Sequence, residues 1–389
     1  MTINGAFKEL NDFIQKHQTE YCELAQRIWA KPELAFQEKF ACAEQIKILK
    51  DYGFEVTSPY AGVDTAYVAT YGSGKPTFCF VAEYDALPEL GHACGHNLIC
   101  TAAIAAGCAV KEIMDKHKIA GQIIVMGTPA EESGGGKVLM LKENCLSGVD
   151  AVMMVHPSWR STPDSGSTAI RRFNVEFIGK SAHAAASPEL GLNALDASIL
   201  LFNGINAWRQ QLPESARIHG IIKDGGVMPN IIPDYSLSRF YLRSTSDETL
   251  DSMEKRFKDM VKGAALMTGT RYEIKAHSVP YRSRQPNQEL NKLYMKYAEE
   301  EGLNPVIPSR GARGSSDFGD FSQQAPGIHP YFGISPCEIA GHSKEFAEAS
   351  NSEYGIAQMI KAAKVMARIG LTFMVDEKFR EKVTTSTIS

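Results

Sequence analysis

A short segment rich in polar side chains, Glu83–Asn97, is the feature that most constrains this chain. It follows an apolar run typical of a strand, Thr77–Ala82, and precedes an apolar run typical of a helix, Leu98–Val110. The segment contains three carboxylates, two histidines and a cysteine. Thiolate, imidazole and carboxylate groups are the ligands of borderline transition metals such as zinc. The pattern therefore predicts a strand, a loop that carries a polar site, and a helix.

Cys94 and His96 are the main ligand candidates in this segment. Residues two apart project to the same side of an extended backbone, so both side chains can bind one ion. Cys-x-His is a short pattern, however, and a cysteine is more often a small buried hydrophobic residue than a ligand. On these two residues alone, a metal site and a packing role are equally open.

Further polar residues follow the next predicted strands. Gln122–Met126 is followed by Glu131 and Glu132, and Ala151–Val155 is followed at once by His156. The alternation of apolar strands and helices is typical of a doubly wound α/β sheet, in which ligands bind at the carboxyl ends of the strands. Acidic and histidine side chains that gather at this edge favour the metal site over a packing role.

The pattern of elements changes near residue 170. From there to residue 282 the strand-like and helix-like runs follow the order β-α-β-β-α-β of ferredoxin-like domains. We therefore expect a doubly wound catalytic domain made of residues 1–169 and 283–389, with an inserted ferredoxin-like α+β domain at 170–282. A glycine-rich stretch, 311–319, is expected to line the cleft, and the tail beyond Lys378 is expected to fray. Four residues of the glycine-rich stretch are candidates for substrate contacts: Arg313, Ser315, Ser316 and Asp317.

Composition and charge exclude several classes of protein. The 389 residues are 44% hydrophobic and 22% charged, as in ordinary globular proteins, and the formal net charge of −4 argues against a nucleic-acid partner. The start, Met1–Leu10, lacks the basic and apolar regions of a signal peptide, and Leu98–Val110 is shorter than the ~20 residues of a membrane span. The eight cysteines form no Cys-x-x-Cys pair, which fits reduced thiols. We expect a cytoplasmic protein without a membrane partner.

Seven segments, in order along the chain, resemble the aminoacylase and carboxypeptidase family of dinuclear metallo-amidohydrolases, a group of metallopeptidases. The segments are Glu83–Pro88, Gly91–Asn97, Pro129–Lys137, Val155–Pro157, Gly179–Ala184, Met228–Asp234 and Ala340–Phe346. The resemblance is strongest to the branch of hippurate hydrolase, the indole-acetyl-amino-acid hydrolases and p-aminobenzoyl-glutamate hydrolase. It implies that the inserted domain serves dimerisation or acts as a lid, and that the protein is a homodimer or a higher homo-oligomer.

The resemblance also implies a two-metal site. Its five ligands fall on Cys94, His96, Glu132, His156 and His342. The general base falls on Glu131, and Asp85 matches an acidic residue that orients a ligand histidine. The wider family has His-x-Asp where this chain has Glu83-Tyr84-Asp85, so a ligand common elsewhere is missing, and occupancy of both metal positions is open.

Three residues of the expected insert are candidates for contacts with substrate. By resemblance, His183 acts in the active site of the other subunit, where it holds the substrate carbonyl or the oxyanion. From the sequence alone His183 also fits a turn histidine beside Pro188. Asn230 matches a substrate-binding asparagine, and Arg243 can pair with a substrate carboxylate.

Together these observations predict a metal-dependent hydrolase of the amide bond in N-acyl or aminobenzoyl amino acids or in dipeptides. A metal-bound hydroxide would attack the carbonyl, with Glu131 as general base. We expect two divalent ions as cofactors, zinc first, with manganese or cobalt as alternatives. Two other hypotheses remain, a hydrolase with Cys94 as nucleophile and a catalytically retired homologue that still binds metal.

Overall fold

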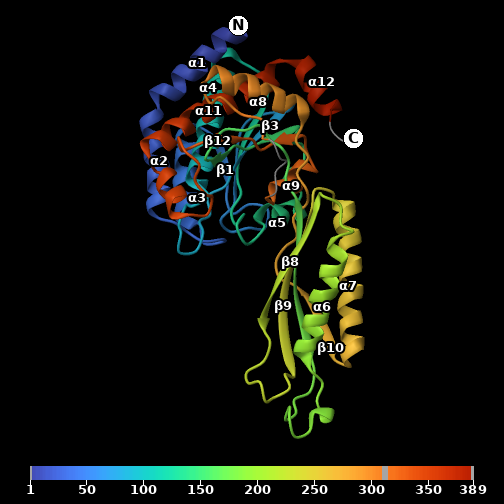
Figure 1. Ribbon diagram of the computed structural model, residues 1–389. Coiled ribbons are helices and arrows are strands. Elements are labelled where there is room, and N and C mark those ends of the chain that lie inside the picture. Colours follow the sequence, from blue (N-terminus) through green and yellow to red (C-terminus); the bar gives the residue numbers. More distant parts are fainter. Residues whose placement is uncertain (1, 309–313, 387–389) are drawn as a thin grey trace. The chain divides into compact units, whose positions relative to one another are not determined.

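The computed structural model describes residues 2–308 and 314–386, and the chain divides into two compact units (Figure 1). The first unit comprises the chain up to Gly166 and most of the chain from Gln285 onward. The second unit comprises Ser167–Arg284 with Gly314 and Ser315. Each unit has its own hydrophobic core and is described by itself.

A six-stranded sheet with the order β1-β2-β4-β3-β5-β11 forms the centre of the first unit. Its strands are β1 (Glu55–Thr57), β2 (Tyr67–Ser73), β3 (Thr77–Ala82), β4 (Gly121–Gly127), β5 (Ala151–Met153) and β11 (Gly327–Ile328). Strands β4, β3, β5 and β11 are parallel, whereas β1 and β2 run antiparallel to their neighbours. The predicted α/β class is confirmed, and the sheet is mixed because the chain enters it through two antiparallel strands.

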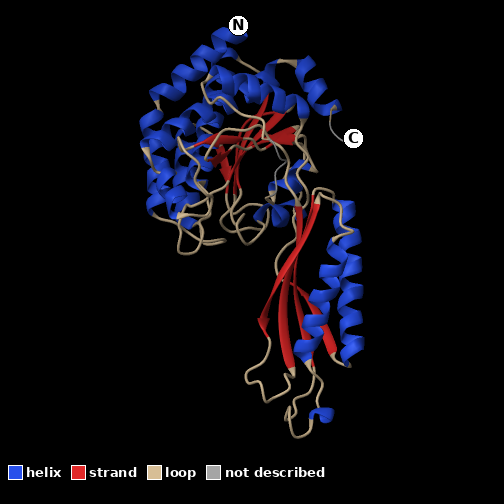
Figure 2. Ribbon diagram, in the orientation of Figure 1, coloured by secondary structure: helices blue, strands red, loops and turns tan. Residues whose placement is uncertain are grey.

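Both faces of this sheet are buried, which explains why its central strand has no polar alternation. On β3, Phe78 and Phe80 belong to one core cluster, and Cys79 and Val81 belong to another. Successive side chains of a strand point to opposite faces, so a strand covered on both sides is apolar throughout. Helices surround the strands of this sheet in Figure 2.

Helices make up most of the rest of the first unit. They are α1 (Ile3–Lys16), α2 (Gln18–Ala30), α3 (Lys39–Asp51), α4 (His96–His117), α5 (Gly136–Lys142), α8 (Gln288–Glu300), α9 (Phe318–Ser322), α10 (Lys344–Ala349), α11 (Glu353–Val375) and α12 (Glu377–Thr385). Two short strands, β6 (His156–Ser158) and β12 (Tyr331–Gly333), pair in parallel beside them.

The expectation that the tail frays beyond Lys378 is wrong, because α12 continues to Thr385. The Asp376 side chain caps this helix by accepting a hydrogen bond from the Phe379 amide. Val383 is fully buried against the core. A cap and two apolar side chains, Phe379 and Val383, therefore hold a segment whose sequence is mostly polar.

Helix α4 is the central helix of the first unit. It is long and apolar enough to cross a membrane, yet 89% of its apolar window is buried inside the protein, as in the core helix of a globular domain. Gly107 lets it approach the sheet closely, since a Cβ at this position would lie 2.3 Å from Cγ2 of Val125 on β4. The helix that starts at the polar segment is thus packed tightly onto the strands on either side of that segment.

The second unit is an antiparallel sheet covered by two helices. Its elements are β7 (Ala169–Ile178), the 3₁₀ helix η1 (Pro188–Leu190), α6 (Ala194–Arg209), β8 (Ala216–Asp224), β9 (Tyr235–Ser244), α7 (Asp247–Thr268) and β10 (Arg271–Ala276). The strands follow the order β10-β7-β9-β8, and α6 and α7 lie on one side of them (Figure 2). Every second residue of β9 is buried, which is the period of a sheet with one covered face.

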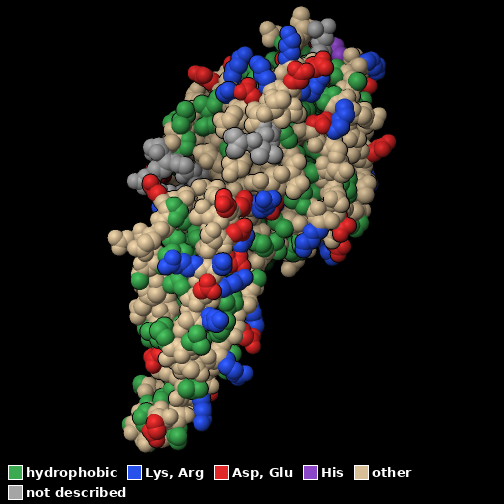
Figure 3. All heavy atoms as spheres, turned by 90° about the vertical axis from the view of Figure 1, so that its right-hand side faces the viewer, with side chains coloured by type: hydrophobic (Ala, Val, Ile, Leu, Met, Phe, Trp, Pro, Cys, Tyr) green, Lys and Arg blue, Asp and Glu red, His purple; other side chains and the backbone are tan. Residues whose placement is uncertain are grey.

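Charged side chains of both signs are mixed on the surface of the second unit. Arg171 pairs with Asp251 and Glu254, and Lys275 lies 2.9 Å from Glu176. The face shown in Figure 3 has blue and red side chains interspersed over this unit. Exposed pairs of this kind contribute little stability, so the buried helix and sheet faces hold the unit together.

Two helical glycines allow a test of the packing between α4 and the sheet. We expect Gly107→Ala to lower the free energy of unfolding by about 1 to 3 kcal/mol, because its Cβ would overlap Val125. Gly263→Ala on α7 is the matched control, since nothing lies within 4 Å of its added Cβ, and it should stabilise by up to about 1 kcal/mol. Urea unfolding of both variants checks this. Equal effects of the two substitutions would contradict the close packing.

Candidate metal centre

The candidate site lies in the first unit, at the carboxyl ends of parallel strands. Glu83 and Asp85 follow β3, Glu131 and Glu132 follow β4, and His156 begins β6, shortly after β5. Because β3, β4 and β5 are parallel neighbours, their carboxyl ends meet at one edge of the sheet. This topology gathers side chains that are far apart in the sequence.

Cys94 and His96 approach the same site through a left-handed turn. Gly95 between them has a φ of 75° and caps the N-terminus of α4. A Cβ on Gly95 would also lie 2.6 Å from Cγ of Pro157, so the turn requires glycine for two reasons. The expectation of an extended segment is wrong here, although the two side chains do converge.

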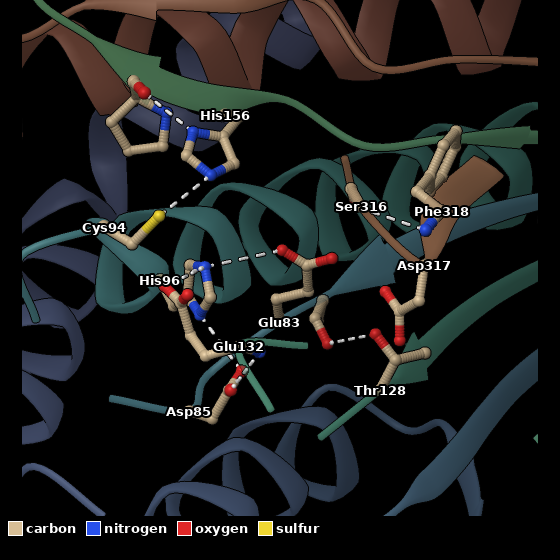
Figure 4. A network of polar contacts seen from close by, with 12 residues as sticks. Glu83, Asp85, Cys94, His96, Thr128, Glu132, His156, Ser316, Asp317 and Phe318 are labelled. Carbon is tan, nitrogen blue, oxygen red and sulfur yellow. Dashed lines mark hydrogen bonds and ion pairs between the residues drawn. The ribbon is translucent and has the colours of Figure 1, made fainter. Parts of the chain in front are cut away.

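The structure brings all five predicted metal ligands together with Glu131. Three groups have potential ligand atoms within 4.8 Å of one another: Cys94 with His96 and His156, Cys94 with Glu132 and His342, and His96 with Glu131 and Glu132. Cys94 and His96 each belong to two of these groups, and so does Glu132. Figure 4 shows Cys94, His96, Glu132 and His156 around the start of α4. The shared members join the three groups into one connected cluster of candidate ligands.

Asp85 orients two members of the cluster. Its Oδ1 lies 3.0 Å from Nδ1 of His96, and its Oδ2 accepts the backbone amide of Glu132 at 2.9 Å. The Nδ1 of His96 therefore donates to a carboxylate, which leaves Nε2 directed at the site. Nδ1 of His156 lies 2.7 Å from the carbonyl oxygen of Pro157, which leaves its Nε2 3.4 Å from the sulfur of Cys94.

Unsatisfied atoms in this cluster fit a bound cation. In the described chain, Oε2 of Glu83, Nε2 of His96 and Oε1 of Glu132 are buried without a hydrogen-bond partner. Nε2 of His96 lies 3.7 Å from Oε2 of Glu83 and 3.8 Å from Oε1 of Glu132. The same oxygen of Glu132 lies 3.7 Å from Nε2 of His342. Two ligand atoms at about 2.1 Å from one ion can be separated by up to about 4.2 Å. The donor set and its spacing therefore suit a divalent ion.

The electrostatics of the cluster also favour a cation. Burial, followed by the charges of Glu83 and Glu132, raises the pKa of Glu131 well above its ordinary value. Burial opposes protonation of His96, but Cys94 and Asp85 outweigh it and raise the pKa of the imidazole. Carboxylates at this edge thus repel one another, and a divalent ion would relieve that repulsion.

A buried lysine, which we did not single out in the sequence, forms ion pairs with two carboxylates beside the candidate ligands. Nζ of Lys137 lies 2.5 Å from Oε1 of Glu83 and 2.7 Å from Oδ1 of Asp317, and all three side chains are fully buried. The Lys137 amide also donates to Oδ2 of Asp317 at 3.0 Å. Burial opposes the charge of Lys137, but Asp317 and Glu83 outweigh it and raise its pKa. Asp317 is thus committed to Lys137 rather than exposed for a substrate, and no local sequence signal indicates this pairing.

Glu38, also missed in the sequence, holds the backbone that presents Glu131. Ala130, directly before Glu131, has a φ of 62°, and its amide donates to Oε1 of Glu38 at 2.9 Å. Oε2 of Glu38 accepts the hydroxyl of Thr65 at 2.9 Å. Burial raises the pKa of Glu38 to about 7. A buried carboxylate therefore fixes the turn between β4 and the Glu131–Glu132 pair.

The remaining candidates lie in the second unit or outside the described residues. His183 and Asn230 are exposed and adjacent, since the Ala184 amide donates to the Asn230 carbonyl at 2.9 Å. Arg243 lies near the end of β9, about 27 Å from Tyr235 at the start of that strand, at about 3.4 Å per residue. It donates to Oγ of Ser315 at 3.0 Å. The second unit therefore groups His183 with Asn230 and separates Arg243 from them.

Two candidates of the glycine-rich stretch remain. Ser316 lies in the first unit, and its hydroxyl accepts the amide of Phe318. Arg313 lies outside the described residues.

Glu38 gives a pH-dependent test of how the Glu131 turn is held. Its pKa is raised on folding, so the native state binds the proton more tightly, and stability falls as pH rises from about 4.5 through about 7. The isosteric Glu38→Gln variant lacks this titration. The stability of the wild type relative to Glu38→Gln should fall by about 3 kcal/mol over that range. Urea unfolding of both proteins at pH 4.5 and 8 checks this, and a difference that does not vary with pH would contradict it.

Comparison with known proteins identifies the family. The model of peptidase family M20/M25/M40 matches residues 79–371. The Xaa-Arg dipeptidase of Mus musculus is 36% identical over 363 residues, which cover 90% of this chain and 84% of that protein. A p-aminobenzoyl-glutamate hydrolase subunit of Escherichia coli is 33% identical over 288 residues, covering 69% of this chain and 60% of that protein.

Solved structures show the same fold. A dinuclear metal-binding peptidase of the M20 family from Bacillus subtilis superposes with a TM-score of 0.70 at 20% identity, covering 92% of this chain and 99% of that one. An aminobenzoyl-glutamate utilization protein from Klebsiella pneumoniae gives a TM-score of 0.69 at 19% identity, covering 95% and 99%. The predicted enzyme class, a hydrolase of amide bonds, is confirmed, and the chain belongs to peptidase family M20/M25/M40.

Proposed function

We propose that this chain hydrolyses the amide bond of dipeptides or N-acyl amino acids with the help of two divalent metal ions. The observation that carries the proposal is the group formed by His96, Glu131 and Glu132, whose potential ligand atoms lie within 4.8 Å of one another. It places a carboxylate that can move a proton beside a carboxylate and an imidazole that can hold an ion. The names of two relatives add Xaa-Arg dipeptides and p-aminobenzoyl-glutamate as the first substrates to test.

The residues divide the work according to their surroundings. Cys94, His96, Glu132, His156 and His342 would hold the ions, zinc first, with manganese or cobalt as alternatives. Bound divalent ions supply a water of lowered pKa and polarise the substrate carbonyl. Glu131 accepts the proton of the attacking water and passes it to the departing amine. The pKa of Glu131, raised first by burial, suits a base that must hold a proton between the two steps.

A cysteine nucleophile is the second candidate, because the sulfur of Cys94 lies 3.4 Å from Nε2 of His156. The surroundings argue against it. Burial, followed by the charge of Glu132, raises the pKa of the Cys94 thiol well above its ordinary value, whereas a nucleophilic cysteine requires a thiolate. Under the metal hypothesis the same sulfur becomes a ligand, and chelation abolishes activity.

Substitution of the proposed base tests the proposal directly. We expect Glu131→Gln to keep the wild-type metal content and to lower kcat by about 100- to 10,000-fold on Xaa-Arg dipeptides or another substrate of the wild type. Glu143→Gln, an exposed residue after α5, is the matched control and should retain full activity. Metal analysis and amine release are measured for both variants.

Removal of the metal separates the two candidate chemistries. Activity lost on chelation and restored by zinc or manganese supports the metal mechanism. Activity that survives complete removal of the metal, or a Glu131→Gln variant with near wild-type kcat, would contradict it. Cys94→Ser should then be the inactive variant instead.

We further propose a division of the chain into a catalytic domain, residues 1–169 and 283–389, and an inserted ferredoxin-like domain, 170–282, that serves dimerisation or acts as a lid. The proposal is supported by the separate hydrophobic core of residues 167–284 and by the β-α-β-β-α-β order of their elements.

His183 is the residue of the inserted domain for which we propose a catalytic role. Nδ1 of His183 accepts the amides of Ala185 and Ala186, at 3.2 and 3.1 Å, so the ring proton lies on Nε2, a donor for an oxyanion.

Asn230 and Arg243 are the proposed substrate-binding residues of the same domain. Asn230 shares an exposed corner with His183, and Arg243 offers a guanidinium for a substrate carboxylate. Burial is the main cause that lowers the pKa of Arg243, because it disfavours the charged guanidinium. A substrate carboxylate paired with Arg243 would stabilise that charge.

Mixed oligomers test whether His183 acts in the partner's site. Glu131→Gln and His183→Ala proteins are each expected to be inactive by about 100-fold or more. If His183 serves the other subunit, a refolded mixture should regain a fraction of wild-type activity, because one of its two sites is complete. Activity assays and native mass spectrometry of the mixture check this. A mixed dimer that stays inactive would contradict action in the partner's site.

A further inference from the structure

Glu83 is a buried carboxylate at the edge of the metal centre to which neither the sequence motifs nor the proposed mechanism gives a role. Its side chain is fully buried, and Oε2 has no hydrogen-bond partner in the described chain. That oxygen lies 3.7 Å from Nε2 of His96, which is also buried and without a partner. Two unsatisfied polar atoms that face each other inside a protein call for a physical cause.

Direct hydrogen bonding does not explain this contact. Nδ1 of His96 donates to Asp85, so Nε2 of a neutral ring is a lone pair that faces another lone-pair atom. A separation of 3.7 Å is also too long for a hydrogen bond from a protonated ring. A cation between the two atoms satisfies both, since two atoms about 2.1 Å from one ion and 3.7 Å apart subtend about 125° at that ion.

Lys137 explains why Glu83 presents only one oxygen. Its Nζ lies 2.5 Å from Oε1 of Glu83 and 2.7 Å from Oδ1 of Asp317. Asp317 also binds the Lys137 backbone amide, so the lysine is fixed at both ends. The ion pair holds one oxygen of Glu83 and leaves the other directed toward His96 (Figure 4). A carboxylate oriented in this way by hydrogen bonds resembles the supported ligands of metal sites.

We propose that Glu83 is an additional ligand of the ion that binds Nε2 of His96, and that Lys137 and Asp317 position it. Glu83 belongs to none of the three ligand groups described above, because its close approach is to His96. It therefore completes the coordination of one ion and leaves the other unaffected. The inference rests on the proposed function, which supplies the ions, and adds a ligand to it.

Calorimetric titration of the metal-stripped full chain with zinc tests this proposal. The wild type should bind two ions. Glu83→Gln should bind one of them normally and the other at least about 10- to 100-fold more weakly, the loss found when partners of metal ligands are removed. Glu143→Gln is the control, since it makes the same change from carboxylate to amide at an exposed position after α5, outside the ligand cluster. It should bind both ions with nearly wild-type affinity.

A spectroscopic reading makes the test independent of activity. Cobalt bound to the wild type should lose one oxygen ligand in Glu83→Gln, which changes its visible absorption, whereas Glu143→Gln should keep the wild-type spectrum. If Glu83→Gln does not fold, Glu83→Asp replaces it, because it keeps a charge beside Lys137 and withdraws the carboxylate from His96. The same losses are expected.

The possible outcomes separate this proposal from the proposed function. Wild-type zinc affinities and cobalt spectrum in the Glu83 variant overturn the role of Glu83 alone. An equal loss in Glu143→Gln also overturns it, because the weaker binding would then not depend on the position of the carboxylate. A wild-type protein that binds no zinc and hydrolyses amides after chelation overturns the proposed function itself.

Discussion

Repulsion among carboxylates at one edge of a parallel sheet is the constraint on which the first unit depends. Glu83, Asp85, Glu131 and Glu132 all leave the carboxyl ends of β3 and β4, where few cations are available to neutralise them. The buried Lys137 pairs with Glu83, and the imidazole of His96 hydrogen-bonds Asp85, which reduces this repulsion. The negative charge that remains would favour a divalent ion at this place.

Carboxylates that repel one another stay close together only if the backbone that carries them is fixed. A cluster of ligands keeps its geometry only if its backbone cannot relax, and here each connection is fixed locally. Gly95 allows α4 to start between two ligands, and Glu38 holds the left-handed turn at Ala130. Helix α4 is in turn pressed onto the sheet at Gly107. These local contacts therefore hold the segments that carry the candidate ligands.

Much of this could be predicted from the sequence, and the limit is set by sequence distance. The central strands of the first unit are largely apolar and buried, and the ligands follow their ends, so the α/β class and the cluster of Cys94, His96 and Glu132 could be recognised from pattern and topology alone. The turn at Gly95 could not, because the close approach of Pro157, which is distant in the sequence, has no local signature. The pairing of Lys137 with Asp317 joins segments 180 residues apart and has no local signature.

The surroundings of Glu83 show how a further carboxylate is accommodated at this edge of the sheet. At the place where the wider family was expected to carry a histidine, this chain has a carboxylate, which adds negative charge to an already acidic edge. Such a change is tolerable only if a cation compensates it, and Lys137 lies against Glu83 and Asp317 with all three groups buried. Removing the Lys137 side chain alone would leave two buried carboxylates without a neighbouring cation, whereas an acid and a base introduced together leave the net charge unchanged. The pair is therefore best understood as one unit, in which the lysine allows a carboxylate to be buried next to His96.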